Sequence, residues 1–292
     1  MALVRNAANT LRKGRIGETT YYASKGRQIA RQALNNSNYG ESARRSLAQQ
    51  RRRVKWANLV NFYKLCSGWM PKAFETKKAG QTDYNKFMQL NVNAQRVALT
   101  RDQAINGGCV VDDFAITQGT LQPVTGSVSG ANVVSGIVCT IYGSSWQDLT
   151  IGALSEDLIS HNNFLKDGMQ LSIVVVSQST DANGIPRAKV DFYEVVLDTT
   201  STELVATYIP GSVSADSGTG KLFVSMSGDI KGAAFIISEL TDTGLKVSSE
   251  TLAGDFTMAE QYATTAVVDA AIETYGLDKE VVLNPDSAEP IA

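Results

Sequence analysis

Apolar and polar residues alternate with a period near two through the middle of the chain, beyond Gly107 and Gly108. Alternation in short runs is typical of antiparallel strands. Turn clusters such as Asp181–Gly184 and Ser214–Gly220 separate the runs. We therefore expect strands at Cys109–Ile116, Leu121–Val128, Val133–Tyr142, Leu171–Ser177, Lys189–Leu197, Glu203–Ile209, Lys221–Met226 and Ala233–Glu239. A short helix near Ser155–Leu165 is expected between two of the strands.

Before this region the apolar spacing is close to 3.6 residues, which predicts two helices. The first runs from Ser42 to about Cys66, and the second from Thr82 to about Asn93. The apolar face of the first helix is expected at Leu47, Val54, Ala57 and Leu65. The pair should form a basic hairpin that needs another part of the protein to pack against.

The two ends have different patterns. Residues 1–40 are basic and rich in small polar residues, which predicts an extended arm. Its Thr-Thr-Tyr-Tyr run, Thr19–Tyr22, favours a strand that pairs with a neighbouring subunit, because it is too short for a sheet of its own. At the other end, Thr257 and Glu260 have capping-box spacing for a helix to about Tyr275. An acidic extended tail is expected over Asp278–Ala292.

These patterns predict an α+β fold built around an antiparallel β-sandwich or barrel-like domain. Four regions follow along the chain: a basic extended arm at 1–40, a basic helical region at 41–104, the β domain at 105–256, and a C-terminal helix with an acidic tail at 257–292.

The amino-acid composition excludes several classes of functional site. The 292 residues are 43% hydrophobic and 19% charged, and His161 is the single histidine. Sites that need two histidines are therefore excluded. The three cysteines, Cys66, Cys109 and Cys139, form no Cys-x-x-Cys pair, so neither a disulfide framework nor a structural zinc site is expected. We expect no secretory signal and no membrane span, since the apolar runs have the length of strands.

Charge is segregated along the chain, although the net charge is only −2. Met1–Arg101 holds 20 Lys and Arg against 4 Asp and Glu, for a net charge of +16. Asp102–Ala292 holds 7 against 25, for a net charge of −18. The two halves can attract each other within one molecule or between molecules, and we favour the second because each sign is so concentrated.

The clearest charged cluster lies on the first predicted helix. Its members are Arg44, Arg45, Arg51, Arg52, Arg53 and Lys55. So many cations on a few turns repel one another unless phosphates or carboxylates face them, and a solvated basic face is the alternative. We expect this cluster to bind DNA or an acidic partner. Further contacts are expected from the arm at Arg12, Lys13, Arg15, Tyr21 and Tyr22.

Motifs that would indicate a reaction are incomplete. Ser217–Lys221 resembles part of a phosphate-binding loop, but the residues that follow read as a strand rather than a helix. Asp112 and Asp113 are adjacent, so on a strand they point to opposite faces, and solvated acids are favoured over a cation site. His161 lies in a polar stretch and is expected at the surface. We predict no catalytic site, no metal and no cofactor.

Several segments between about residues 10 and 125 resemble a known family. They are the glycine- and arginine-rich start with Tyr21-Tyr22, Gln49–Arg52 running into Trp56 and Phe62, and Thr82–Phe87 leading to Asn91. This order resembles a family widespread in Bacteroides-type bacteria and their phages, and it is similar to virion proteins of crAss-like tailed phages. The resemblance implies a structural role in a virion assembled in the host cytoplasm, and it carries no catalytic residues.

The combined expectation is a non-enzymatic ring (connector) subunit of the neck or tail of a tailed phage. It would form a homo-oligomer through complementary basic and acidic surfaces and contact portal, tail or capsid subunits. Two alternatives stay open. One is a nucleic-acid-binding protein, with non-specific contact to packaged DNA and an acidic domain that recruits a partner. The other is a capsid-decorating β-module.

Overall fold

The computed structural model describes residues 2–3, 14–16, 19–24, 27–32, 47–124, 126–142, 146, 148–242 and 244–283. The chain divides into two compact units, Met1–Gln50 and Arg51–Ala292. We describe each unit by itself.

The first unit contains a small antiparallel sheet in the order β1-β4-β3-β2. Its strands are β1 (Ala2–Leu3), β2 (Gly14–Ile16), β3 (Thr19–Ser24) and β4 (Arg27–Gln32). This differs from the extended arm that the sequence predicts. Tyr21 lies opposite Gly14 on one side and Ala30 on the other, so two strands of the same chain pair with the Thr-Thr-Tyr-Tyr run. The segment β4 was not expected as a strand because Arg and Gln occupy four of its six positions.

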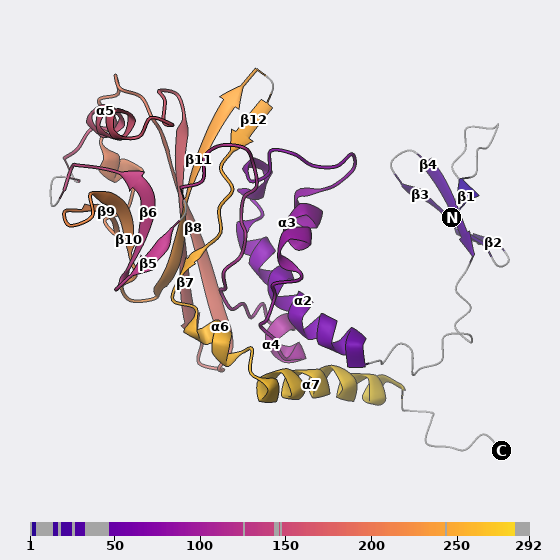
Figure 1. Ribbon diagram of the computed structural model, residues 1–292. Coiled ribbons are helices and arrows are strands. Elements are labelled where there is room, and N and C mark those ends of the chain that lie inside the picture. Colours follow the sequence, from indigo (N-terminus) through magenta and orange to yellow (C-terminus); the bar gives the residue numbers. More distant parts are fainter. Residues whose placement is uncertain are drawn as a thin grey trace, which may run out of the picture. The chain divides into compact units, whose positions relative to one another are not determined.

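The second unit contains two further antiparallel sheets, shown in Figure 1. The outer sheet has the order β5-β6-β10-β9, with β5 (Ser127–Ser129), β6 (Asn132–Val138), β9 (Val213–Asp216) and β10 (Lys221–Ser225). The central sheet has the order β12-β11-β7-β8, with β7 (Gln170–Thr180), β8 (Pro186–Val196), β11 (Ile230–Thr241) and β12 (Gly244–Val247). The short strand β13 (Ala253–Gly254) also pairs with β11. The two sheets confirm the predicted α+β class with a sandwich-like domain.

The central sheet is buried on both faces, which explains the nearly continuous apolar sequence of β7. Leu171, Ile173 and Val175 point into the core shared with the outer sheet. Val174 and Val176 point the other way, into the core under the helices. Successive side chains of a strand alternate between faces, so a strand between two cores is apolar at every position.

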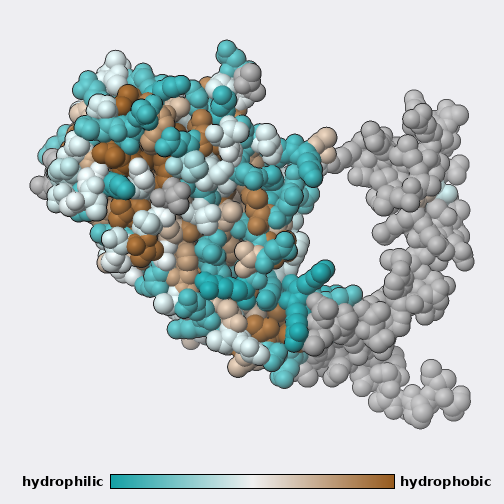
Figure 2. All heavy atoms as spheres, in the orientation of Figure 1, coloured by the Kyte–Doolittle hydropathy of each residue, from teal (hydrophilic) through white to brown (hydrophobic). Residues whose placement is uncertain are grey.

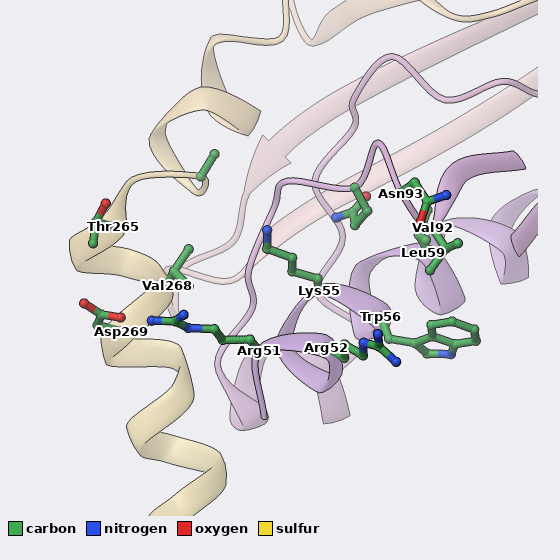
Figure 3. A pocket seen from close by; sticks show the side chains of 12 residues that line it. Arg51, Arg52, Lys55, Trp56, Leu59, Val92, Asn93, Thr265, Val268 and Asp269 are labelled. Carbon is green, nitrogen blue, oxygen red and sulfur yellow. The ribbon is translucent and has the colours of Figure 1, made fainter. Parts of the chain in front are cut away.

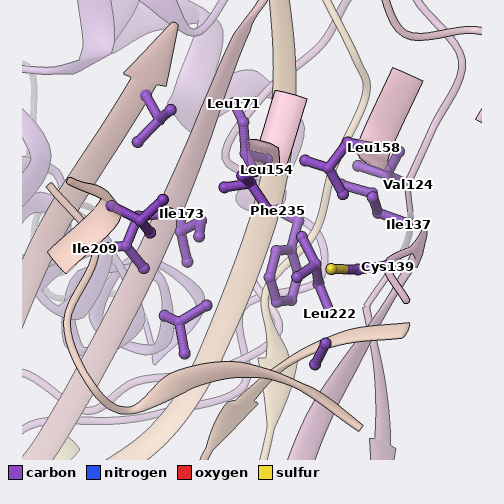
Figure 4. Packing of buried hydrophobic residues seen from close by; sticks show 14 of the residues in the cluster. Val124, Ile137, Cys139, Leu154, Leu158, Leu171, Ile173, Ile209, Leu222 and Phe235 are labelled. Carbon is purple, nitrogen blue, oxygen red and sulfur yellow. The ribbon is translucent and has the colours of Figure 1, made fainter. Parts of the chain in front are cut away.

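The first core lies between the two sheets and the helix α5 (Ile151–His161). Figure 4 shows Leu154 and Leu158 of this helix packed near Phe235, Ile137 and Leu222 of the strands. All five side chains are fully buried. Burying large aliphatic and aromatic side chains contributes roughly 1.5–3 kcal/mol each, so this core fixes α5 on the sandwich.

Helices cover the other face of the central sheet (Figure 1). They are α2 (Leu47–Cys66), η1 (Met70–Lys72) and α3 (Asp83–Asn91). The helices α4 (Arg101–Ile105), α6 (Thr257–Gln261) and α7 (Thr265–Leu283) lie at one end of this layer, at the bottom of the unit in Figure 1. The short helix η3 (Val205–Thr207) contributes Val205 to the core between the two sheets. Phe62 of α2 packs on Phe87 of α3 and on Phe114, with ring centroids 6.1 and 4.6 Å away. Leu65, expected on this buried face, is exposed, because the buried face of α2 turns through Leu59, Phe62 and Cys66.

The segment Cys109–Ile116, expected as a strand, is extended but joins no sheet. Its ends have backbone partners: the Cys109 N–H donates to the Pro186 carbonyl, and Ala115 forms an isolated antiparallel bridge with Thr251. Side-chain amides supply further partners. Asn58 exchanges two hydrogen bonds of 2.8 Å with the backbone of Val110, and Asn91 exchanges two of 2.9 and 2.8 Å with that of Ala115. The backbone groups are thereby satisfied without a ladder, which the apolar pattern alone could not reveal.

Other boundaries also differ from the expected ones. Glu203–Ile209 contains the short helix η3 rather than a strand. The expected C-terminal helix is interrupted between Gln261 and Thr265, and α7 then continues into the region expected as an extended tail. The Thr257 side chain does not cap α6. Instead the Thr257 N–H donates to Asp255 Oδ1 at 3.1 Å.

Candidate functional site

A groove of about 640 Å³ lies beside the N-terminal half of α2. Figure 3 shows its walls: α2 on one side, the turn after α3 on another, and the start of α7 opposite. The charged members of the lining are Arg51, Arg52, Lys55 and Asp269. The groove is within the size range of ligand sites, and its walls come from segments distant in sequence.

The packing of α2 determines which of its side chains reach the groove. Val54 is fully buried and packs with Ala98, Ala271 and Ile272 in a small cluster between α2 and α7. Val54 thus marks the buried side of α2 at this point. Arg51, one turn before Val54, lies at the edge of that side, where it is exposed and lines the groove.

Backbone contacts hold the groove walls together. The Leu99 N–H donates to the Val54 carbonyl of α2 at 3.2 Å, and the Ala98 N–H donates to the Tyr262 carbonyl at 3.1 Å. The Arg101 N–H donates to Thr274 Oγ1 of α7 at 3.0 Å. The segment around residue 99 therefore ties α2 to both C-terminal helices, and the groove does not depend on long surface side chains for its shape.

The groove cations lack acidic partners. Throughout the part of the chain that the structure describes, no acid forms an ion pair with Arg51, Arg52 or Lys55. Figure 3 shows the Arg51 guanidinium extended toward α7, where Asp269 lies, but the two groups do not form an ion pair. Three neighbouring positive charges face one carboxylate that pairs with none of them, and the net positive charge of the groove favours an anionic ligand.

The predicted cluster is only partly brought together. The groove is lined by Arg51, Arg52 and Lys55. Arg53 is not part of the lining, and its charge acts on Tyr275 of α7. Burial raises the pKa of Tyr275, and the positive charges of Arg101 and Arg53 act in the opposite direction. Arg44 and Arg45 lie outside the described residues, as do Arg12 and Lys13 of the arm. Arg15, Tyr21 and Tyr22 lie in β2 and β3 of the first unit.

The groove also has an apolar wall that the sequence did not indicate. Trp56 is 41% exposed and Val92 is 38% exposed, and both line the groove. Their proximity arises from packing of α3 against α2, because the two residues are distant in sequence. On the hydropathy surface of Figure 2, hydrophobic residues reach the visible face in separate patches rather than one continuous area.

Gln95 contributes an unsatisfied acceptor to the same site. Its side chain is 5% exposed, and its Nε2 donates to the Val97 carbonyl at 3.0 Å. Its Oε1 is buried and accepts no hydrogen bond. Buried polar atoms without partners cost about 1–3 kcal/mol each, so this oxygen would gain from a donor brought by a ligand.

The adjacent acids have different environments. Asp112 is 1% exposed and accepts two-pronged hydrogen bonds from Arg96, at 2.8 Å from Nη2 and 3.1 Å from Nε. The expectation of a solvated acid is therefore wrong for Asp112, and Asp113 is exposed. Hydrogen bonding to Asp112 raises the pKa of Arg96.

The remaining candidates have structural explanations. His161 is exposed at the end of α5, and its Nδ1 lies 2.8 Å from the Asp157 carbonyl. The loop that resembles a phosphate site is a turn between β9 and β10, in which Asp216 accepts hydrogen bonds from the Gly218 and Thr219 N–H groups. Burial raises the pKa of Cys66 to about 12, which disfavours its reactive thiolate form.

Within the described residues, no group of three or more histidine, cysteine, aspartate or glutamate side chains is arranged to hold a metal ion. None of the helices described is at once long enough and apolar enough to cross a membrane. Comparison with protein-family models, with curated proteins and with solved structures finds no match.

Proposed function

We propose that this protein is a non-enzymatic structural subunit that assembles with other subunits through the groove beside α2. In keeping with the resemblance over about residues 10–125, the assembly is a ring in the neck or tail of a tailed-phage virion. The groove binds an acidic surface of the adjacent subunit, and the two-core body keeps the groove rigid.

The observation that carries this proposal is the set of unpaired cations on a fixed helix. Arg51, Arg52 and Lys55 lie within about one turn of α2 and have no acidic partner among the described residues. Like charges at this spacing destabilise a helix unless something neutralises them. The part of the chain after Arg101 has a net charge of −18, so a second copy supplies the complementary charge.

The test is the molar mass of the full chain by size-exclusion chromatography with light scattering, at low and high salt. We expect an oligomer at low salt that shifts toward monomer in the variant Arg51→Ala/Arg52→Ala/Lys55→Ala. The control Lys78→Ala/Lys86→Ala/Lys166→Ala removes the same charge elsewhere and should leave the oligomer intact. A wild-type protein that is monomeric at both salt concentrations would overturn the proposal.

A second candidate is binding of single-stranded nucleic acid, which the exposed Trp56 beside Arg52 favours. An aromatic face next to cations can stack a base while the cations contact phosphates. Titration of a labelled oligonucleotide at several salt concentrations tests it. Steep salt dependence that is lost with Trp56→Ala, in a protein that stays monomeric, would make this the better account.

A further inference from the structure

The hairpin formed by β11 and β12 ends in an exposed tip with an apolar residue between acids. Leu240 is 83% exposed, the highest value among the large hydrophobic residues whose exposure is described. Glu239 and Asp242 flank it in the sequence, and neither forms an ion pair or a side-chain hydrogen bond in the described part of the chain, although Lys246 of β12 lies opposite Glu239 in the strand register. The pairing of Thr241 with Gly244 closes the hairpin and fixes the tip.

We propose that this tip, residues 239–242, docks in the groove beside α2 of a second copy of the chain. The inference rests on the proposed function, since it names the acidic surface that the groove binds. It is carried by the match between two features that the structure leaves unpaired, one at each end of the same unit.

The match is both electrostatic and apolar. The Asp242 carboxylate, in the turn of the tip, meets the groove cations Arg51 and Arg52, and Glu239, on the other face of the strand, adds to the negative charge of the tip. Leu240 enters between Trp56 and Val92, which are themselves partly exposed in the groove. Burial of the Leu240 side chain against the aromatic wall removes its apolar surface from water, which favours the contact.

Gln95 offers the hairpin a hydrogen-bond acceptor in the groove. Its buried Oε1 lacks a donor, whereas β12 is the outermost strand of the central sheet, and among the described residues only Leu121 pairs with its outer edge, at the Val247 end away from the tip. The outer edge of such a strand presents backbone N–H groups that have no acceptor in the sheet. A hairpin that enters the groove therefore brings donors of the type that the Gln95 carboxamide oxygen lacks.

The tip cannot reach the groove of its own chain. The strand β13 pairs with Gly232 and Ala233 near the start of β11 and leads directly into α6 and α7, so the groove lies near that end of the strand. The tip lies eight residues beyond Ala233, at Thr241, or about 26 Å along the strand. Figure 1 likewise shows the β11–β12 tip and α7 at opposite ends of the unit.

The contact must therefore join two molecules, and it uses different surfaces on each. Such a heterologous contact repeats from copy to copy and closes into a ring if the rotation permits. A hairpin tip buries less surface than the roughly 1,200–2,000 Å² of a stable interface, so a single contact is weak. We expect association at high protein concentration that weakens as salt rises.

Charge reversal tests the contact in the full chain. The tip variant Glu239→Lys/Asp242→Lys has a positive tip and a positive groove, and the groove variant Arg51→Glu/Arg52→Glu has a negative tip and a negative groove. Sedimentation equilibrium of each alone should give an association constant at least about tenfold lower than that of the wild type. An equimolar mixture should associate again, because each tip then meets a groove of opposite sign.

Further variants separate charge from packing and from misfolding. Leu240→Ser removes the apolar anchor without changing the charge and should also weaken association. The matched controls Asp148→Lys/Glu156→Lys and Lys78→Glu/Lys86→Glu reverse equal charges elsewhere and should associate like the wild type. Glu239 and Lys86 are partly exposed and the other positions are exposed, and thermal unfolding measures whether each variant is folded.

The outcomes distinguish the two proposals. If the wild type associates and the tip and groove variants associate equally well alone, or if their mixture stays monomeric, the hairpin contact is wrong while assembly still stands. If the wild type stays monomeric at every concentration and salt condition, both the contact and the proposed function are wrong. Loss of oligonucleotide binding in the groove variant, with self-association unchanged, would assign the groove to nucleic acid instead.

Discussion

Glu250 is a buried carboxylic acid whose protonation should control stability near neutral pH. It is 3% exposed, and its Oε1 accepts a hydrogen bond of 2.6 Å from the Val124 N–H. Burial raises its pKa from 4.5 to about 7, although the hydrogen bonds from Val124 and Ser248 act in the opposite direction. Its backbone N–H donates to Thr117 Oγ1 at 2.9 Å, so it ties the segment before β5 to the central sheet.

The direction of the effect follows from the raised pKa. In the unfolded chain the carboxyl ionises at its ordinary pKa, whereas in the folded protein it keeps its proton to higher pH. Its contribution to stability is therefore complete below pH 4.5 and is lost as pH rises through about 7. The difference between these two pKa values corresponds to about 3 kcal/mol of unfolding free energy.

The variant Glu250→Gln keeps an oxygen acceptor for the Val124 N–H but cannot ionise. Urea unfolding at about pH 5 and about pH 8 should show the variant gaining about 2–3 kcal/mol relative to the wild type as pH rises. The control Glu156→Gln removes an exposed glutamate on α5 and should show no comparable gain. A constant difference between Glu250→Gln and the wild type at both pH values would refute the reasoning.

Three substitutions test individual contacts of the fold by urea unfolding. Asn58→Ala leaves a buried backbone N–H and carbonyl unpaired and should cost about 2–4 kcal/mol; a cost below about 0.5 kcal/mol would show that water replaces the amide. Arg96→Ala leaves the buried Asp112 carboxylate without its cation and should cost about 2 kcal/mol, discounted because Arg96 is partly exposed. Gly152→Ala places a Cβ 2.6 Å from the Ser201 carbonyl oxygen and should cost about 2 kcal/mol, whereas Gly68→Ala meets no atom within 4 Å. Equal effects of the two glycine substitutions would contradict the close contact at α5.

The fold was predictable where one sequence pattern dominated. The apolar run of β7 and the turn clusters between the neighbouring strands predict strands from local sequence alone. The extended segment from Cys109 was not predictable, because Asn58 and Asn91 replace a strand from far away in the chain. The break before Thr265 also depends on packing, since the sequence on both sides favours a helix.

The candidate site was predictable only in part. A cluster of cations is visible in the sequence, and three of its members line one groove. Its other walls come from Val92, Gln95 and the start of α7, which no local pattern connects to α2. Neither the unsatisfied oxygen of Gln95 nor the exposure of Leu240 has a signal in the sequence, because both depend on which neighbours the fold supplies.

The central claim is that the unpaired cations beside α2 join one copy of the chain to another. Sedimentation velocity of the unmodified full-length protein, over a range of concentrations at low and at high salt, tests it most directly. The account predicts species larger than the 31.4 kDa monomer at low salt, which return to monomer as salt screens the charges. A single monomeric species under every condition would contradict it.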